Sequence, residues 1–169
     1  MSRAFAFLAV LALALPACEK PDEKPMPDPA NSAAAAPEGG DGFVVTQLTT
    51  SQSTMKSDLA AEVKKAKAQG LKPYVEFWAS WCGPCMAIKK SLGDSRMKQA
   101  FKGTYIIQID ADKAPDLAGT GFSSSVIPVF YELGDDGKPT GRKIDGGAWG
   151  DNIPENMAPP LDKFFHAAS

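Results

Sequence analysis

Two cysteines separated by two residues, Cys82 and Cys85, are the part of this 169-residue sequence best suited to chemistry. A segment dense in Tyr, Val, Phe and Trp predicts a buried strand over Pro73–Ala79, and a helix is expected from about Gly83 to Leu92. A thiol at the start of a helix lies near unpaired backbone amides and the positive end of the helix dipole, which favour the thiolate. We therefore expect Cys82 to be an exposed nucleophile and Cys85, about one turn into the helix, to be the resolving thiol.

The same cysteine spacing has two other common uses. It can be half of a zinc site, but the only other cysteine and the only histidine, Cys18 and His166, leave the ligand set incomplete. It can also be a permanent structural disulfide, although a bridge that closes so small a loop adds little stability through chain entropy. A redox-active dithiol needs no metal and no organic cofactor, and we expect neither here.

The residues around the cysteines resemble the active-site region of the thioredoxin family. Its five-residue motif is matched letter for letter by Trp81-Cys82-Gly83-Pro84-Cys85, and its approach strand by Phe77-Trp78-Ala79. The resemblance covers roughly residues 43–169. It implies a thioredoxin fold, in which a mixed central sheet has helices on both faces, and it implies dithiol–disulfide exchange.

The resemblance also implies roles for residues outside the cysteine pair. The family has a cis-proline that faces the dithiol, preceded by a residue whose backbone pairs with the substrate, and Pro128 and Ile127 match these positions. Most X-Pro bonds are trans, so the cis geometry is predicted by the resemblance and not by the residues themselves. Trp81, Gly83 and Pro84 are expected to complete the substrate-binding surface.

Glu76 occupies the position where thioredoxins usually carry a buried aspartate beneath the resolving cysteine. A desolvated carboxyl has a raised pKa and could take the proton of Cys85, whereas a solvated edge residue is the simpler alternative. The family often places a partner lysine on the next strand, but the segment Tyr105–Ile109 carries no charge.

Three neighbouring features have open or simpler expected roles. Trp78 is expected to pack in the core, and Lys89 and Lys90 are expected to form a solvated face of the helix. The segment Gly146–Gly150 is either a substrate-contacting loop, since the family places a glycine near the dithiol in this region, or a flexible connection.

The remaining elements must position this site. The pattern of apolar, capping and turn residues predicts strands at Phe43–Leu48, Tyr105–Asp110, Val129–Leu133 and Gly141–Asp145. It predicts helices at Ser53–Gln69, Asp94–Phe101, Ala114–Ala118 and Leu161–Ala167, the first capped by Ser53 and the last started by Pro159-Pro160. Because strand and helix alternate first and a hairpin follows, we expect an α/β domain with a mixed sheet and helices on both faces.

The N-terminal residues predict export. A positive end precedes an apolar run of 12 residues, Ala4–Leu15, which is shorter than the roughly 20 that span a bilayer, so residues 1–17 are expected to be a signal peptide. Leu15–Cys18 resembles the lipobox of bacterial lipoproteins, which implies that Cys18 is lipidated. Ordinary cleavage that leaves a free thiol is the alternative. Residues 18–42 are expected to be a disordered linker rich in Pro, Ala and acids, and residues 43–169 the thioredoxin-like domain.

Composition and charge narrow the function further. A net charge of -2 and a pI of about 5.4 provide no basic surface for nucleic acid. We expect a monomeric thioredoxin-like protein-disulfide oxidoreductase, lipid-anchored on the periplasmic side of the cell envelope. It would reduce disulfides of exported proteins and be recharged by a redox partner. A disulfide oxidant or isomerase is an alternative, as is a non-catalytic envelope binding module on the same fold.

Overall fold

The structure is a computed structural model that describes residues 42–167. The predicted signal peptide, Cys18 and nearly all of the predicted linker lie outside the described residues. None of the helices within residues 42–167 is long and apolar enough to cross a bilayer.

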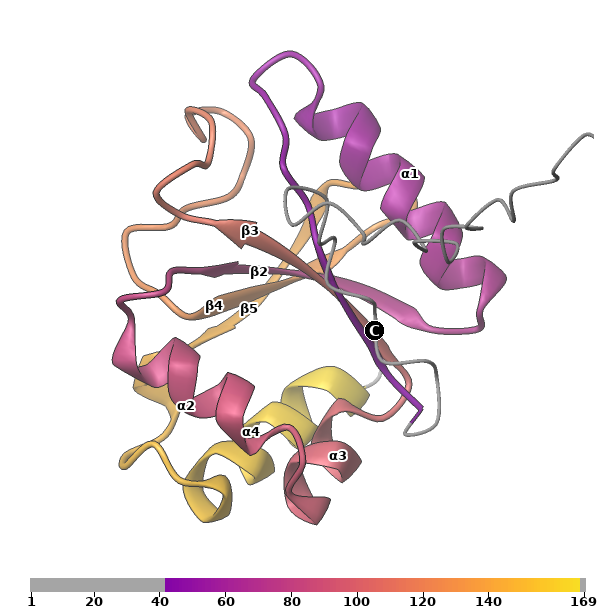
Figure 1. Cartoon of the computed structure of the whole chain (residues 1–169). Coiled ribbons are helices and arrows are strands. Elements are labelled where there is room, and N and C mark those ends of the chain that lie inside the picture. The colour runs from indigo at the N-terminus through magenta and orange to yellow at the C-terminus, as the bar shows by residue number, and fades with distance from the viewer. Residues whose placement is uncertain (1–41, 168–169) are drawn as a thin grey trace, which may run out of the picture. The chain divides into compact units, whose positions relative to one another are not determined.

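Five strands form one mixed sheet at the centre of the domain (Figure 1). They are β1 (Val44–Gln47), β2 (Lys72–Trp78), β3 (Thr104–Asp110), β4 (Val129–Leu133) and β5 (Pro139–Asp145), and their order in the sheet is β1-β3-β2-β4-β5. β1 and β2 both pair with β3 in parallel, whereas β4 runs antiparallel to β2 and to β5. The predicted mixed sheet is therefore confirmed, with β2 in its middle.

Helices cover both faces of this sheet. Helix α1 (Met55–Ala68) lies on one face, and α2 (Gly83–Ser91), α3 (Ser95–Phe101) and α4 (Pro154–His166) lie on the other (Figure 1). Side chains alternate between the two faces along a strand. Accordingly, Val75 and Phe77 of β2 pack with α1, whereas Tyr74 packs with the α2–α4 layer.

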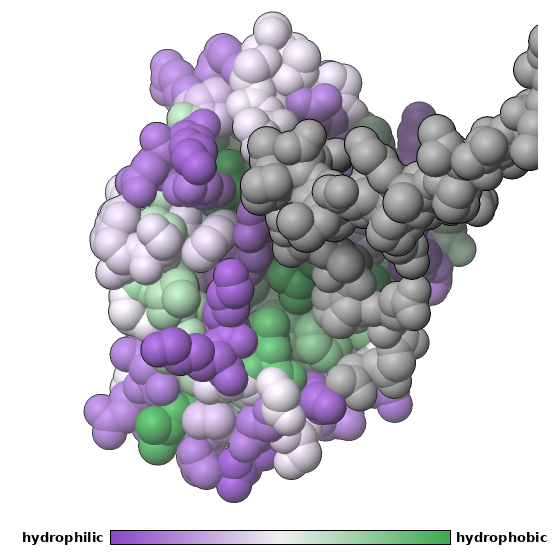
Figure 2. Space-filling model, in the orientation of Figure 1, coloured by the Kyte–Doolittle hydropathy of each residue, from purple (hydrophilic) through white to green (hydrophobic). Residues whose placement is uncertain are grey.

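The inner strands of the sheet are buried between these layers because they are mostly apolar, whereas β5 at one edge is partly exposed. Every residue of β4 is buried, and so are the residues of β3 up to its last one, Asp110. In the view of Figure 2, hydrophilic residues dominate the surface, and hydrophobic residues are visible between the sheet and the α2–α3 layer. The segment Trp81–Cys85, which follows β2, is thus attached to the central strand of the sheet.

The predicted short helix at Ala114–Ala118 is wrong, because this part of the β3–β4 connection has no regular structure. Pro115 lacks an amide donor, and the Asp116 carboxylate accepts the backbone N–H of Ala118, which makes a turn in place of a helical bond. Gly119 follows with a positive φ of 74°. Local side-chain bonding therefore prevails over the helical propensity of the alanines and leucine in this segment.

The boundaries of two helices also differ from the sequence pattern. α1 begins at Met55 and its N-cap is Thr54 without a side-chain bond, so Ser53 does not cap it. α4 begins at Pro154, seven residues before the predicted Leu161, and therefore contains Pro159 and Pro160. Tertiary burial of the first turns of α4, through Met157 and Ala158, holds this helix together where propensity alone predicts a break.

Candidate functional site

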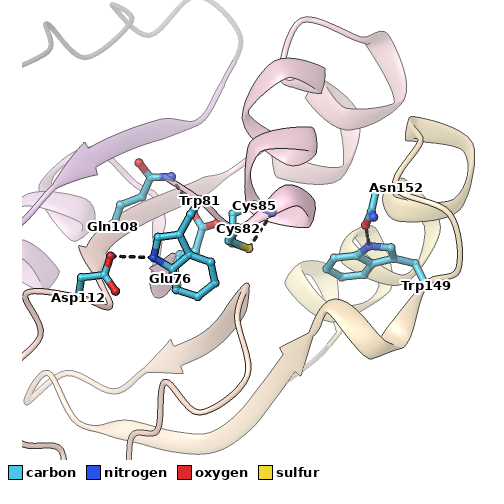
Figure 3. The surroundings of a disulfide bond; sticks show 8 residues. All are labelled: Glu76, Trp81, Cys82, Cys85, Gln108, Asp112, Trp149 and Asn152. Atoms are coloured by element: carbon cyan, nitrogen blue, oxygen red, sulfur yellow. Dashed lines mark hydrogen bonds between the residues drawn. A yellow bond between two sulfur atoms is a disulfide. The ribbon is translucent and has the colours of Figure 1, made fainter. Parts of the chain in front are cut away.

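The cysteine pair lies where the predicted strand and helix meet. Cys82 is the N-cap of α2, its Sγ accepts the backbone N–H of Cys85 at 3.2 Å, and Pro84 occupies the first turn, where no amide donor is needed. The two cysteines form a disulfide with a Cα–Cα distance of 5.3 Å (Figure 3). The sulfur of Cys82 thus lies at the positive end of the helix, which is the position that stabilises a thiolate when the pair is reduced.

The expectation that Cys82 is exposed is wrong for this oxidised state. Cys82 is 4% exposed and Cys85 is 2% exposed. The two residues form a small apolar cluster with Ala79, against which Trp78 and Ile127 pack. The bond to Cys85 holds the Cys82 sulfur against the helix, next to this cluster. Trp81 and Gly83 on either side of Cys82 are exposed, so the backbone around the sulfur remains accessible.

The predicted proline element lies against the cysteines. The Ile127–Pro128 bond is cis, as the resemblance implies, and Ile127 contacts the cysteine cluster. The Pro128 carbonyl accepts the backbone N–H of Gly146 at 3.1 Å. A Cβ added to Gly146 would lie 3.3 Å from Pro128 Cδ, so this glycine allows a close approach to the proline ring.

Gly146–Ala148 forms a 3-10 turn and not a flexible connection. The Asp145 carboxylate caps the turn by accepting the Gly147 N–H at 2.9 Å. Trp149, which follows, is buried, and its indole N–H donates to Asn152 at 3.0 Å (Figure 3). The segment is therefore an ordered border of the site, next to Pro128.

Glu76 is buried and faces the layer that contains α2. It is 2% exposed, so the alternative of a solvated edge residue is wrong. Its Oε2 accepts a hydrogen bond of 2.7 Å from Nε2 of Gln108, the residue beside it on β3 (Figure 3). Burial raises the pKa of Glu76 to about 7, against the lowering effects of the Gln108 hydrogen bond and the Lys89 ammonium. A carboxyl with this pKa can both take and give a proton near neutral pH.

Two tryptophans border the cysteines in different ways. Trp81 is 68% exposed, and its indole N–H donates to the Asp112 carboxylate at 2.8 Å (Figure 3). Trp78 is half-buried against the cysteine cluster, in partial agreement with the predicted core role. Lys89 is exposed as expected, but its ammonium lies 5.1 Å from the centroid of the Trp78 ring, so it is not simply solvated.

Sequence reasoning missed the roles of Gln108 and Asp112, and it expected only a solvated side chain for Lys89. Gln108 could have been found, because it is the one polar residue within an otherwise apolar strand core and such a residue needs a buried partner. Asp112 and Lys89 left no such signal, since their contacts depend on where the β3–β4 connection and α2 lie. Among the described residues, no group of three or more His, Cys, Asp or Glu side chains could hold a metal ion.

Comparison with known proteins identifies relatives of this chain. The family model described as thioredoxin matches residues 50–158. A thioredoxin from Staphylococcus haemolyticus is 34% identical over 94 residues, which cover 53% of this chain and 78% of that protein. Thioredoxin Asp f 28 from Aspergillus fumigatus is 33% identical over 73 residues, which cover 43% of this chain and 64% of that protein.

Coverage is partial for several relatives. The chain spans less than two thirds of the length of Asp f 28 and of mitochondrial thioredoxin-3 from Saccharomyces cerevisiae, with 64% and 62% covered. The crystal structure of that yeast protein in its oxidised form has 27% identity and a TM-score of 0.41, and the match covers 66% of this chain and 87% of that chain. The family match over residues 50–158, with the site geometry, shows that this chain belongs to the thioredoxin family.

Proposed function

We propose that this chain is a thiol–disulfide oxidoreductase that reduces disulfides of exported proteins through Cys82 and Cys85. The observation that carries the proposal is the position of the Cys82 sulfur, which caps α2 and is bonded to Cys85. Ile127, the residue before the cis-proline Pro128, packs against this pair. Membership of the thioredoxin family supports the same class of chemistry.

The reaction has two exchange steps. In the reduced enzyme, the Cys82 thiolate attacks one sulfur of a client disulfide, which forms a mixed disulfide and releases the other client sulfur as a thiolate. Cys85 then loses its proton and attacks the Cys82 sulfur. This step forms the Cys82–Cys85 disulfide seen in the structure and releases the second client thiolate. Two electrons pass from the enzyme to the client, and a redox partner must return them.

Glu76 is the proposed proton acceptor for Cys85. It is buried on the sheet face that α2 covers, and its pKa is raised to about 7, so its carboxylate can accept a proton at neutral pH. Trp81, Gly83 and Pro84 are the proposed contact surface for the client, together with Ile127 and Pro128. Trp81 and Gly83 are exposed, and a Cβ added to Gly83 would meet nothing within 4 Å, so a client backbone can approach there.

The reducing direction and the location are further parts of the proposal. Gly83 and Pro84 between the cysteines are the residues of reducing thioredoxins. The N-terminal sequence supports export, and Cys18 is the proposed lipid attachment point that holds the domain on the periplasmic side of a membrane. Replacing Cys18 with Ser should release the chain from the membrane fraction. Continued membrane association of that variant would remove the lipid anchor from the proposal.

Trapping tests the chemistry and identifies the client. Cys85→Ala should leave clients covalently attached to Cys82, visible as bands that dithiothreitol removes. The Cys82→Ala, Cys85→Ala double variant is the control for disulfides formed elsewhere. If Cys85→Ala captures nothing beyond the double variant, and Cys82→Ser reduces insulin disulfides as fast as the wild-type chain, the binding-module alternative is favoured.

The reduction potential tests the direction. Equilibration with glutathione buffers should give a value near about -270 mV for a reductant, whereas a value near about -120 mV would identify an oxidant. The second result would overturn the direction and leave the exchange chemistry in place.

A further inference from the structure

Among the described residues, Glu76 forms no salt bridge, whereas the two other buried glutamates, Glu62 and Glu132, each have a basic partner within 4.0 Å. Its neighbour on β3 is the amide of Gln108, and its neighbour on β4 is Phe130. The charge that acts on it comes from the third element packed against it, helix α2, through Lys89.

The position of Lys89 follows from two simple periodicities. Lys89 is four residues after Cys85, so both lie on the same side of α2. Trp78 is two residues after Glu76, so both point to the same face of β2. The Lys89 ammonium lies 5.1 Å from the centroid of the Trp78 ring, and Trp78 packs against the two cysteines. The aromatic ring thus holds the cation of α2 against β2, the strand that carries Glu76.

We propose that Lys89 is a positioning residue for the resolving step: its ammonium, held on the face of Trp78, sets how readily Glu76 takes the proton of Cys85. This inference rests on the proposed function. A positive charge near the carboxylate favours its ionised form, so Lys89 makes Glu76 available as a base at a lower pH. Because Lys89 is exposed, its effect weakens as salt concentration rises.

The test uses Lys89→Met, which removes the charge and keeps the length of the side chain. Its matched control is Lys90→Met, which removes the same charge from the next residue of α2, which is also exposed. Lys89→Arg keeps the charge and the stacking on Trp78. The Glu76 carboxyl is titrated by carbon NMR in the full chain. The rate at which Cys85 resolves a mixed disulfide between Cys82 and a small aromatic thiol is measured against pH.

In Lys89→Met, the titration midpoint of Glu76 and the pH at which the resolving rate is half-maximal should both rise by about half a unit, and more at low salt than at high salt. Lys90→Met should match the wild type, and Lys89→Arg should restore it. Equal midpoints in Lys89→Met and the wild type would overturn the inference. Equal shifts in Lys89→Met and Lys90→Met would also overturn it, because net charge alone would then explain the change.

The two proposals can fail separately. If the wild-type chain resolved no mixed disulfide, the proposed function would be lost, yet the NMR titration would still show whether Lys89 acts on Glu76. If the wild-type chain is active and the titration midpoint of Glu76 is the same in Lys89→Met, only the inference about Lys89 is lost.

Discussion

Glu62 and Glu76 are both buried carboxylates, but they lie on opposite sides of the sheet and have different partners. Glu62, on α1, accepts bonds of 2.6 Å from the Lys65 ammonium and 2.8 Å from the Tyr105 hydroxyl. Within residues 42–167, the only hydrogen-bond partner of Glu76 is the neutral Gln108 amide at 2.7 Å. The Lys65 ammonium and the Tyr105 hydroxyl offset the cost of burying Glu62, whereas no cation lies within 4.0 Å of Glu76 among the described residues.

Burial shifts the pKa of one group on each side of the sheet. On the α1 side, burial and the bond to Glu62 raise the pKa of Tyr105, so the tyrosine stays a hydrogen-bond donor at all ordinary pH values. On the dithiol side, the pKa of Glu76 rises to about 7. The α1 side therefore bonds its buried carboxylate to a cation and to a tyrosine hydroxyl. The dithiol side has a group that changes protonation at the pH of the proposed reaction.

The largest effect is expected from a substitution at Gly137 that disrupts the packing of α1. Gly137 has a positive φ of 76°, and a Cβ there would lie 2.7 Å from the backbone nitrogen of Ala60 on α1. Gly137→Ala should reduce the free energy of unfolding by about 4 kcal/mol, because the left-handed backbone and the backbone clash both oppose it. Urea unfolding followed by circular dichroism measures this loss.

Gly134→Ala is the control within the same turn. Its Cβ would make ordinary contacts, the shortest being 3.5 Å to the Asp136 side chain. Similar stabilities for the two variants would show that the turn can move away from α1, contrary to the fixed packing described here.

The next effect tests Glu76 itself. The pKa of Glu76 rises from an ordinary value of 4.5 to about 7. Between these two pH values the folded state therefore keeps a proton on Glu76 that the unfolded state loses. The free energy of unfolding of the oxidised protein should fall as pH rises from 4.5 to about 7 and stay level above it. Glu76→Gln should abolish this fall and be more stable than the wild type by about 3 kcal/mol at pH 8. The same variant should slow the resolving step by about 100-fold at pH 8.

Glu62→Gln is the matched variant on the α1 side of the sheet. It removes the bond from Lys65, whose side chain is 62% exposed, and we expect a loss of about 1 kcal/mol of stability with an unchanged pH–rate profile. Urea titrations from pH 4 to 9 and stopped-flow rates compare both variants. The contrast between the two carboxylates would be wrong if Glu62→Gln altered the pH–rate profile as Glu76→Gln does.

The smallest effect concerns close packing on the dithiol side. A Cβ on Gly146 would lie 3.3 Å from Cδ of Pro128, a side-chain contact that can relax where the Gly137 backbone contact cannot. Gly146→Ala should cost about 1 kcal/mol. Gly150→Ala, whose nearest contact would be 4.0 Å to Asn156, should cost less. Thermal unfolding of both variants measures the difference, and equal melting temperatures would show that Gly146 is not packed tightly on Pro128.

Much of the fold and the centre of the site could be predicted from local sequence. The alternation and capping patterns located all five strands and most helices, because these depend on residues close together in the chain. The spacing of Cys82 and Cys85 at a strand–helix junction placed the sulfur at the helix N-terminus. The cis bond before Pro128 came from the family resemblance, since an isolated X-Pro bond is usually trans.

The amino-acid sequence by itself determined the Cys82–Cys85 pair, the strand before it and the carboxylate of Glu76 within that strand. Only the tertiary structure decided what surrounds them: the burial of Cys82, the pairing of Glu76 with Gln108, and the place of Lys89 on Trp78. These contacts join residues that are distant in the chain or on different elements. They depend on strand register and on how α2 packs against the sheet, which local propensity does not encode.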